Sequence, residues 1–219
     1  MAKNQTTEKI SKASLRNGVI LALFALISTG LIALTHLITK DRIAQAIETA
    51  LAKRLNQIVP SSFYDNDVYR DCTVLSHPEL LGENELKAYR MRNQGKNYAV
   101  FITSVAPDGY AGKITLITGI LNDGSIAGVR ITNHQETPGL GDKIEIEKSD
   151  WITQFDGRSL SNTSQEGWQV KKDGGEFDAL TGATITPRAI IKAVHKTLQF
   201  YQPNQQHLYA PENPCGAAH

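Results

Sequence analysis

An uncharged run from Gly18 to Ile38 constrains this 219-residue chain more than any other feature. As a helix that rises about 1.5 Å per residue, the run reaches roughly 31 Å, the thickness of a membrane's hydrocarbon core. Its hydroxyl groups can bond to the helix backbone, and His36 lies near one end. We therefore expect residues 16–40 to form a single transmembrane anchor, preceded by a polar leader at residues 1–15.

A cleaved signal peptide is the competing interpretation of this run, because Ala44 and Ala46 have the small-residue spacing of a cleavage site. It predicts a secreted protein whose mature chain begins at Ile47. Charged residues at 40–42 separate that site from the apolar run, which is also longer than a usual signal-peptide core. These two features favour an uncleaved anchor. Basic residues flank the run on both sides in nearly equal number, so charge leaves the orientation in the membrane open.

Residues 41–60 are expected to form an amphipathic stalk helix that ends at Pro60, because proline cannot continue a helix. This helix either extends the anchor away from the membrane or docks on the globular part of the chain. Its apolar positions recur at helical spacing: Ile43, Ile47, Leu51, Leu55 and Ile58.

A globular domain is expected over residues 68–201. Composition predicts strands at 98–105, 113–121 and 126–132, and a short strand at 168–170. The turn signals Pro107-Asp108-Gly109 and Asn122-Asp123-Gly124 join the first three strands closely. Connections this short favour an antiparallel meander.

Two helices are expected to flank this sheet. One covers residues 142–155 and begins at an aspartate, a favourable N-cap residue. The other covers residues 187–201, with Thr186 as N-cap and Pro187 in the first helical position. Residues 202–219 show no pattern and are expected to form a flexible tail. The predicted fold class is α+β, with a single N-terminal transmembrane helix and a domain of antiparallel sheet and flanking helices.

Several common functional classes are excluded by composition and spacing. The chain has 23 basic and 22 acidic residues and no long basic run, so nothing in it indicates nucleic-acid binding. Cys72 and Cys215 are too few for a disulfide framework or an iron–sulfur cluster, although they can pair in an oxidising compartment. No histidine pair has the spacing of metal ligands, and no nucleophile elbow occurs. We therefore expect no metal site and no catalytic acid–base pair.

The segment from Asp178 to Thr184 combines small and hydroxyl residues directly before the last expected helix. A helix N-terminus carries free N–H groups and a partial positive charge, which suit a phosphate. The Thr184 hydroxyl can contact such a phosphate or be bonded to it. Taken alone, so short a stretch more often serves ordinary turn and capping chemistry.

A second glycine-containing segment covers residues 133–144 and is expected to be a loop. Its Pro138-Gly139 pair fits a type II turn, in which the glycine takes a positive φ. Gly141 permits a further close approach of the backbone.

Both segments resemble sequences of the FMN-binding domain family. Asp-x-x-Thr-Gly-Ala-Thr at residues 178–184 is similar to that family's flavinylation signal, and Glu-Thr-Pro-Gly-Leu-Gly at 136–141 is similar to a second family stretch. The resemblance implies that a flavin transferase recognises Asp178 and joins FMN to Thr184 through a phosphoester bond. It further implies the following cofactor-binding residues: Thr184, Thr181, Gly182, Ala183, Leu180, Glu136, Thr137, Leu140 and Gly141.

Leader, anchor, stalk and both motifs together resemble the G-subunit family of the Rnf, or Rsx, ion-translocating electron transport complexes. The C subunits of sodium-pumping NADH:quinone reductases are relatives of that family. The resemblance implies a single-pass protein of the bacterial inner membrane, with a cytoplasmic leader at 1–15 and a periplasmic FMN-binding domain at 68–201. It also implies the other membrane subunits as partners, and a redox relay without independent substrate turnover. The residues alone leave open a membrane-anchored extracytoplasmic binding or scaffold domain without a redox cofactor.

Overall fold

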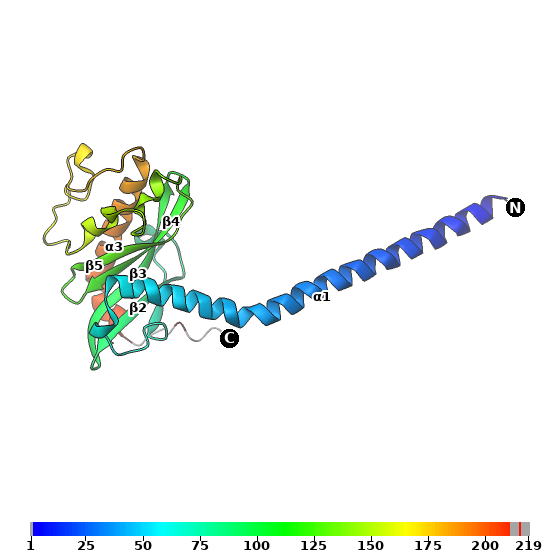
Figure 1. Cartoon of the computed structure of the whole chain (residues 1–219), viewed down its shortest axis with the longest axis horizontal. Coiled ribbons are helices and arrows are strands. Elements are labelled where there is room, and N and C mark those ends of the chain that lie inside the picture. The colour runs from blue at the N-terminus through cyan, green and yellow to red at the C-terminus, as the bar shows by residue number, and fades with distance from the viewer. Residues whose placement is uncertain (1, 211–214, 216–219) are drawn as a thin grey trace. The chain divides into compact units, whose positions relative to one another are not determined.

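The computed structural model describes residues 2–210 and 215, with side chains described for residues 14–210 and 215. The chain divides into two compact units, Met1–Ala50 and Leu51–His219. The first unit is formed by the N-terminal part of helix α1 (Ala2–Ile58). The second contains the end of α1, the sheet and the remaining helices (Figure 1).

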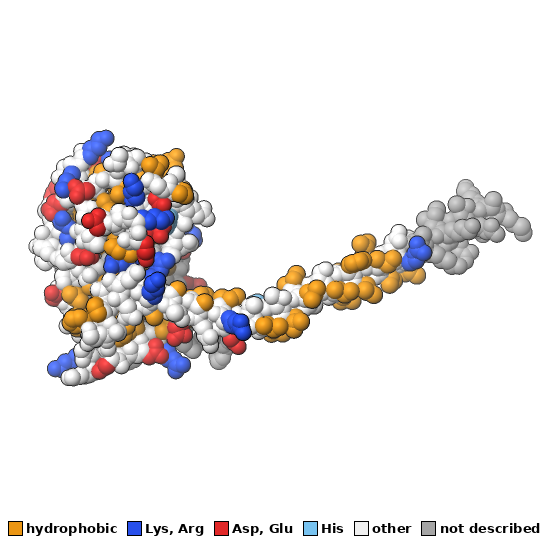
Figure 2. Space-filling view, in the orientation of Figure 1, with side chains coloured by type: hydrophobic (Ala, Val, Ile, Leu, Met, Phe, Trp, Pro, Cys, Tyr) orange, Lys and Arg blue, Asp and Glu red, His pale blue; other side chains and the backbone are white. Residues whose placement is uncertain are grey.

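The exposed surface of α1 in the first unit is apolar over many turns, as Figure 2 shows. Many large apolar side chains of this part are exposed; Leu21 and Phe24, for example, are 70% and 65% exposed. Such a surface is favourable in lipid but not in water. A window of this helix has a mean hydropathy of 2.3 and no buried residue, so the helix is long and apolar enough to cross a membrane. The expected leader, anchor and stalk share one continuous helical backbone.

In the second unit, the last turns of α1 dock on the sheet. The helix ends at Ile58, two residues before Pro60, as expected. Leu55 and Val59 are only 3% and 4% exposed and belong to an apolar cluster with residues of the sheet. The expected stalk is therefore continuous with the anchor and also docked at its far end.

Five strands form one antiparallel sheet in the order β1-β2-β3-β4-β5. They are β1 (Cys72–Leu75), β2 (Leu86–Asn93), β3 (Lys96–Gly109), β4 (Gly112–Leu121) and β5 (Ile126–Asn133). The expected meander is confirmed in β3, β4 and β5, and the α+β class is confirmed with it. Two further strands precede the meander and were not predicted.

The two faces of the sheet pack against different helices. On β3, Val100 and Ile102 point into the cluster that contains helix α3 (Ile185–Tyr209), which crosses one face of the sheet in Figure 1. Ala99 and Phe101 point into the other cluster, which contains the end of α1. This alternation follows the two-residue period of a strand. Each large side chain buried in this way contributes roughly 1.5–3 kcal/mol.

The single helix expected at 142–155 is wrong, because the structure has two short 3-10 turns there. They are η2 (Gly141–Ile144) and η3 (Asp150–Phe155). The Asp142 side chain accepts a hydrogen bond from Lys148 (2.8 Å) and caps no helix, whereas Ser149 caps η3. The short strand expected at 168–170 is likewise wrong, since only one isolated bridge, between Val170 and Phe177, forms there.

Helix α3 is longer at both ends than predicted. It begins at Ile185, so that Thr184 and not Thr186 occupies the N-cap position. It also continues to Tyr209, so the first part of the tail expected at 202–219 is helical. Residues 211–214 and 216–219 of that tail lie outside the described residues.

Tertiary contacts stabilise this extended C-terminal end of α3. Leu208 and Tyr209 are buried, and their carbonyl oxygens accept hydrogen bonds from the guanidinium groups of Arg90 (2.5 Å) and Arg92 (3.1 Å). These donors satisfy helix carbonyls that lack a partner within the helix. The helix continues through Pro203, although proline removes one backbone donor.

Candidate functional site

The segment from Asp178 to Thr184 is a tight turn whose first residue is held by side chains of η3. The Asp178 backbone N–H donates to Gln154 Oε1 (2.7 Å), and its carbonyl oxygen accepts from Trp151 Nε1 (2.6 Å). The Asp178 carboxylate also pairs with Lys171 (2.7 Å). Both backbone groups of the residue are therefore fixed, which orients the start of the turn.

Thr184 is exposed at the other end of this turn, immediately before the first helical residue of α3. Its hydroxyl makes no capping hydrogen bond, and its carbonyl oxygen accepts from Arg188 Nη1 (2.7 Å). A hydroxyl placed in this way is accessible for modification and lies beside the N–H groups of a helix N-terminus.

The carboxylate of Glu136 is the buried polar centre of the second motif. Glu136 is 4% exposed, and its two oxygens accept from the Ala111 backbone N–H (3.0 Å) and from Thr186 Oγ1 (2.5 Å). Thr186 therefore bonds across the site and does not cap the helix. A Cβ atom on Gly141 would lie 2.8 Å from Glu136 Oε2, so a larger residue there would displace the carboxylate that bonds to Thr186.

The two motifs contact each other through Leu140 and Gly182. Gly182 has a φ of +81°, and a Cβ atom there would lie 2.8 Å from Leu140 Cδ2. Gly139, just before Leu140, has a φ of +78°, which confirms the positive φ expected at this turn. Glycines thus allow the second motif to cover the turn that precedes Thr184.

A pocket of about 240 Å³ lies where the motifs meet. It is lined by Tyr110, Glu136, Thr137, Leu140, Gly141, Gly182, Ala183, Thr184, Ile185 and Thr186. Of the predicted site residues, Leu180, Thr181 and Asp178 face a neighbouring hollow instead, together with Trp151 and Gln154. Another pocket of the same volume, around Tyr201, includes neither motif, so we assign no role to it.

Sequence reasoning missed the residues that complete this pocket. Tyr110 follows the β3 turn signal and is 67% exposed, while Ile185 opens α3 and is 45% exposed. With Leu140, which is 42% exposed, they form an apolar rim around the pocket. The only signal in the sequence was an aromatic residue directly after a predicted turn.

Hydrogen bonds tie the Glu136 loop to the segment that follows it. The Glu136 backbone N–H donates to His134 Nδ1 (3.0 Å), so the other ring nitrogen of this histidine carries the proton and donates to Glu145 (2.9 Å). Lys148 bridges Glu145 (3.0 Å) and Asp142 (2.8 Å). Hydrogen bonds from His134 and then Lys148 lower the pKa of Glu145. These hydrogen bonds and ion pairs hold the loop that carries Glu136 in place at the edge of the pocket.

This geometry fits the flavin nucleotide that the sequence motifs imply. Tyr110, Leu140 and Ile185 offer apolar surface to a planar ring, and the exposed Thr184 hydroxyl stands at the same pocket. The first N–H groups of α3 are suited to a phosphate. The pocket is smaller than the roughly 300–1,000 Å³ of pockets that enclose a ligand. A flavin seated there would remain partly exposed.

Comparison with known proteins agrees with this assignment. Residues 109–199 match the FMN-binding domain, and residues 1–58 match the RnfG N-terminal region. A membrane helix followed by such a domain defines the class of membrane-anchored FMN-binding proteins.

The G subunit of the ion-translocating oxidoreductase complex of Vibrio atlanticus is 46% identical over 92% of this chain and 96% of its own length. The corresponding G subunits of Shewanella oneidensis and Pseudomonas aeruginosa are each 45% identical over 94% of this chain, and over 97% and 96% of their own lengths. The chain belongs to the family of these G subunits.

Proposed function

We propose that this protein is the membrane-anchored flavoprotein subunit of an ion-translocating electron transport complex, and that it relays electrons through FMN attached to Thr184 by a phosphoester bond. The observation that carries the proposal is the exposed Thr184 hydroxyl, free of any capping bond, at a pocket built by both motifs. The family of G subunits supports the assignment to a complex with other membrane subunits.

Attachment requires a flavin dinucleotide and a flavin transferase. The Thr184 oxygen forms a bond to the phosphorus on the flavin side of the pyrophosphate, and the bond from that phosphorus to the bridging oxygen breaks. AMP leaves, and the hydroxyl proton passes to a base of the transferase or to water. No electron is gained or lost in this step. Asp178, held by Trp151 and Gln154, presents the recognition side of the turn.

When bound, a flavin can take one or two electrons, so it can connect two-electron donors with one-electron carriers. The chain's own residues bind and orient. Both Glu136 oxygens are engaged in hydrogen bonds, so this carboxylate fixes the loop rather than transferring protons. The apolar rim of Tyr110, Leu140 and Ile185 reduces the access of water to the pocket. The arrangement supports a relay and not independent turnover of a soluble substrate.

We further propose that the domain lies in the periplasm and the leader in the cytoplasm. Charge around the anchor left this orientation open, but the cysteines now bear on it. Cys72 and Cys215 form a disulfide, with Cα atoms 5.3 Å apart, and the Cys215 backbone N–H donates to the Cys72 carbonyl oxygen (3.2 Å). Disulfides persist in the bacterial periplasm and are rare in the cytosol. The pairing therefore supports an external domain on an inner-membrane anchor.

The attachment is tested with two substitutions at one position, expressed in a host that contains the transferase. Thr184→Val keeps the branched shape and removes the hydroxyl, whereas Thr184→Ser keeps the hydroxyl. We expect flavin fluorescence on a denaturing gel for the wild type, a weaker signal for Thr184→Ser and none for Thr184→Val. A labelled Thr184→Val protein would refute Thr184 as the acceptor. A colourless wild-type protein from this host would instead favour an anchored scaffold domain without cofactor.

A further inference from the structure

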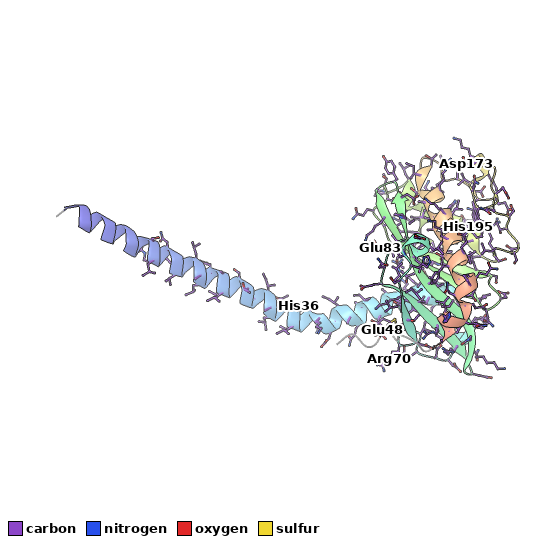
Figure 3. All side chains as sticks on the ribbon, turned by 180° about the vertical axis from the view of Figure 1, so that it is seen from behind. His36, Glu48, Arg70, Glu83, Asp173 and His195 are labelled. Atoms are coloured by element: carbon purple, nitrogen blue, oxygen red, sulfur yellow. A yellow bond between two sulfur atoms is a disulfide. The ribbon has the colours of Figure 1, made fainter. Side chains whose placement is uncertain are left out.

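Arg188 connects the end of the turn from Asp178 to Thr184 with the acidic side chain of Asp173, beside the start of α3. Its Nη1 donates to the Thr184 carbonyl oxygen (2.7 Å), while Nε and Nη2 donate to the two oxygens of Asp173 (2.6 and 2.9 Å). Asp173 lies near the end of the domain at which α3 begins (Figure 3). A bidentate pair of this kind fixes the plane of the guanidinium.

Two properties make this guanidinium available to an anion. A guanidinium has five N–H donors, and the contacts to described residues use three of them, so donors remain for another acceptor. Its hydrogen bonds with Asp173 raise the pKa of Arg188 and lower that of Asp173, so both groups stay charged at neutral pH. Without Arg188, the carboxylate of Asp173 would lack its positive partner and would repel an anion on Thr184.

The distance from Arg188 to the Thr184 hydroxyl is set by covalent geometry. The hydroxyl and carbonyl oxygens of one threonine lie within about 5 Å of each other by standard bond lengths. Because Arg188 Nη1 already contacts the carbonyl oxygen, a phosphate on the hydroxyl lies within reach of the same guanidinium. The helix N-terminus adds partial positive charge from the same side.

We propose that Arg188 binds the phosphate of the phosphoester on Thr184, and that Asp173 holds the guanidinium in position for it. This inference rests on the proposed attachment at Thr184. It assigns a phosphate-binding role to a side chain outside both sequence motifs. During attachment, the same contact stabilises the negative charge on the phosphate that the Thr184 oxygen approaches.

Lys192 provides a matched control on the same helix. It lies one turn beyond Arg188, is exposed, and forms a similar ion pair with Asp108 (2.6 Å). Arg188→Gln and Lys192→Gln therefore each remove one exposed ion pair of α3, and such pairs contribute little to stability. The two variants differ in their distance from Thr184.

The test is a time course of flavin incorporation into the full-length protein, with purified transferase and FAD, followed by in-gel fluorescence. We expect Arg188→Gln to react roughly ten- to a hundredfold more slowly than Lys192→Gln, as for the loss of one charge-assisted hydrogen bond. Arg188→Lys keeps the charge and is expected to be intermediate. An Arg188→Gln rate within about twofold of the control rate would overturn the inference.

The phosphorus NMR signal of the attached phosphoester gives a second readout. If Arg188 had only a structural role, its replacement would leave the position of this signal unchanged. After long incubation, we expect this signal to be shifted in Arg188→Gln relative to wild type and to be unshifted in Lys192→Gln. An identical signal in all three proteins would rule out direct contact. If the wild type gains no flavin at Thr184, the proposed function fails. If the wild type is labelled there and Arg188→Gln matches the control, only the present inference fails.

Discussion

Removal of the Thr186 hydroxyl should destabilise the domain more than removal of a comparable hydroxyl elsewhere on α3. Thr186 is fully buried and donates to the carboxylate of Glu136, which is itself 4% exposed. Thr186→Val preserves the shape of the side chain and leaves one buried carboxylate oxygen without its donor. A hydrogen bond to a charged group contributes about 1.5–3 kcal/mol. We expect a loss of that size in the free energy of unfolding.

Thr197→Val is the matched control for this prediction. Thr197 is also fully buried on α3, but its hydroxyl bonds to the neutral partners Ser104 Oγ (2.9 Å) and the Ala193 carbonyl oxygen (2.8 Å). The Ala193 carbonyl oxygen also accepts the backbone N–H four residues later in α3, so only the bond to Ser104 is lost without replacement, and one neutral hydrogen bond contributes about 0.5–1.5 kcal/mol. Thr186→Val should therefore cost about 1 kcal/mol more than Thr197→Val.

The assay is urea unfolding of the detergent-solubilised protein, followed by tryptophan fluorescence. Both tryptophans of the chain, Trp151 and Trp168, are buried in the domain, so the signal reports on the domain alone. Equal losses for the two valine variants would refute the argument that the buried Glu136 carboxylate is the acceptor that the Thr186 hydroxyl stabilises. A double-mutant cycle with Glu136→Gln should give a coupling energy above about 0.5 kcal/mol, because the two side chains are in contact.

Two further predictions concern charge in the domain. Asp71→Ala should lower the free energy of unfolding by about 3–5 kcal/mol, because it leaves the buried guanidinium of Arg90, 2% exposed, without its carboxylate partner at 2.8 Å. Denaturant titration of the variant measures this loss, and a loss under about 1 kcal/mol would contradict the prediction. Burial lowers the pKa of His195, which stacks on Trp168 (ring centroids 5.1 Å apart). The folded state therefore favours the neutral ring, and stability should fall as the pH drops below the unfolded value of about 6.5 towards the lower folded pKa. His195→Phe keeps a stacked ring and should show a flatter melting temperature between pH 7 and pH 5, whereas an unchanged profile would contradict the assignment.

The sheet could be predicted from sequence only where strand-forming residues are bounded by short turn signals. The strands β3, β4 and β5 combine β-branched residues with short turn signals, and all three were found. Strand β2 has arginines at positions 90 and 92, so its sequence looks solvated. In the structure these two arginines form ion pairs with Asp71. They also donate hydrogen bonds to the last carbonyl oxygens of α3, which lie more than a hundred residues further along the chain. No local pattern reveals such a partner.

The same reason explains the error at the start of α3. Threonine followed by proline is a strong local signal for an N-cap, and it placed the cap at Thr186. The Thr186 hydroxyl instead bonds to Glu136, fifty positions earlier in the chain. The helix starts at Ile185, and Thr184 occupies the N-cap position without a capping bond from its hydroxyl. Motif resemblance pointed to both segments of the candidate site, but the contacts that bring these segments together are tertiary.

The buried and charged contacts around Thr184 explain how an exposed residue can be held in one place. Trp151 and Gln154 fix the start of the turn through Asp178, and Arg188 fixes its end. Between these points Gly182 lies against Leu140, whose own loop is held by the Glu136–Thr186 hydrogen bond. Weak binding is expected for a partly open pocket of this size, because few contacts offset the freedom that a ligand loses. The covalent bond proposed at this hydroxyl would remove that requirement, so the pocket could stay open and still retain a flavin.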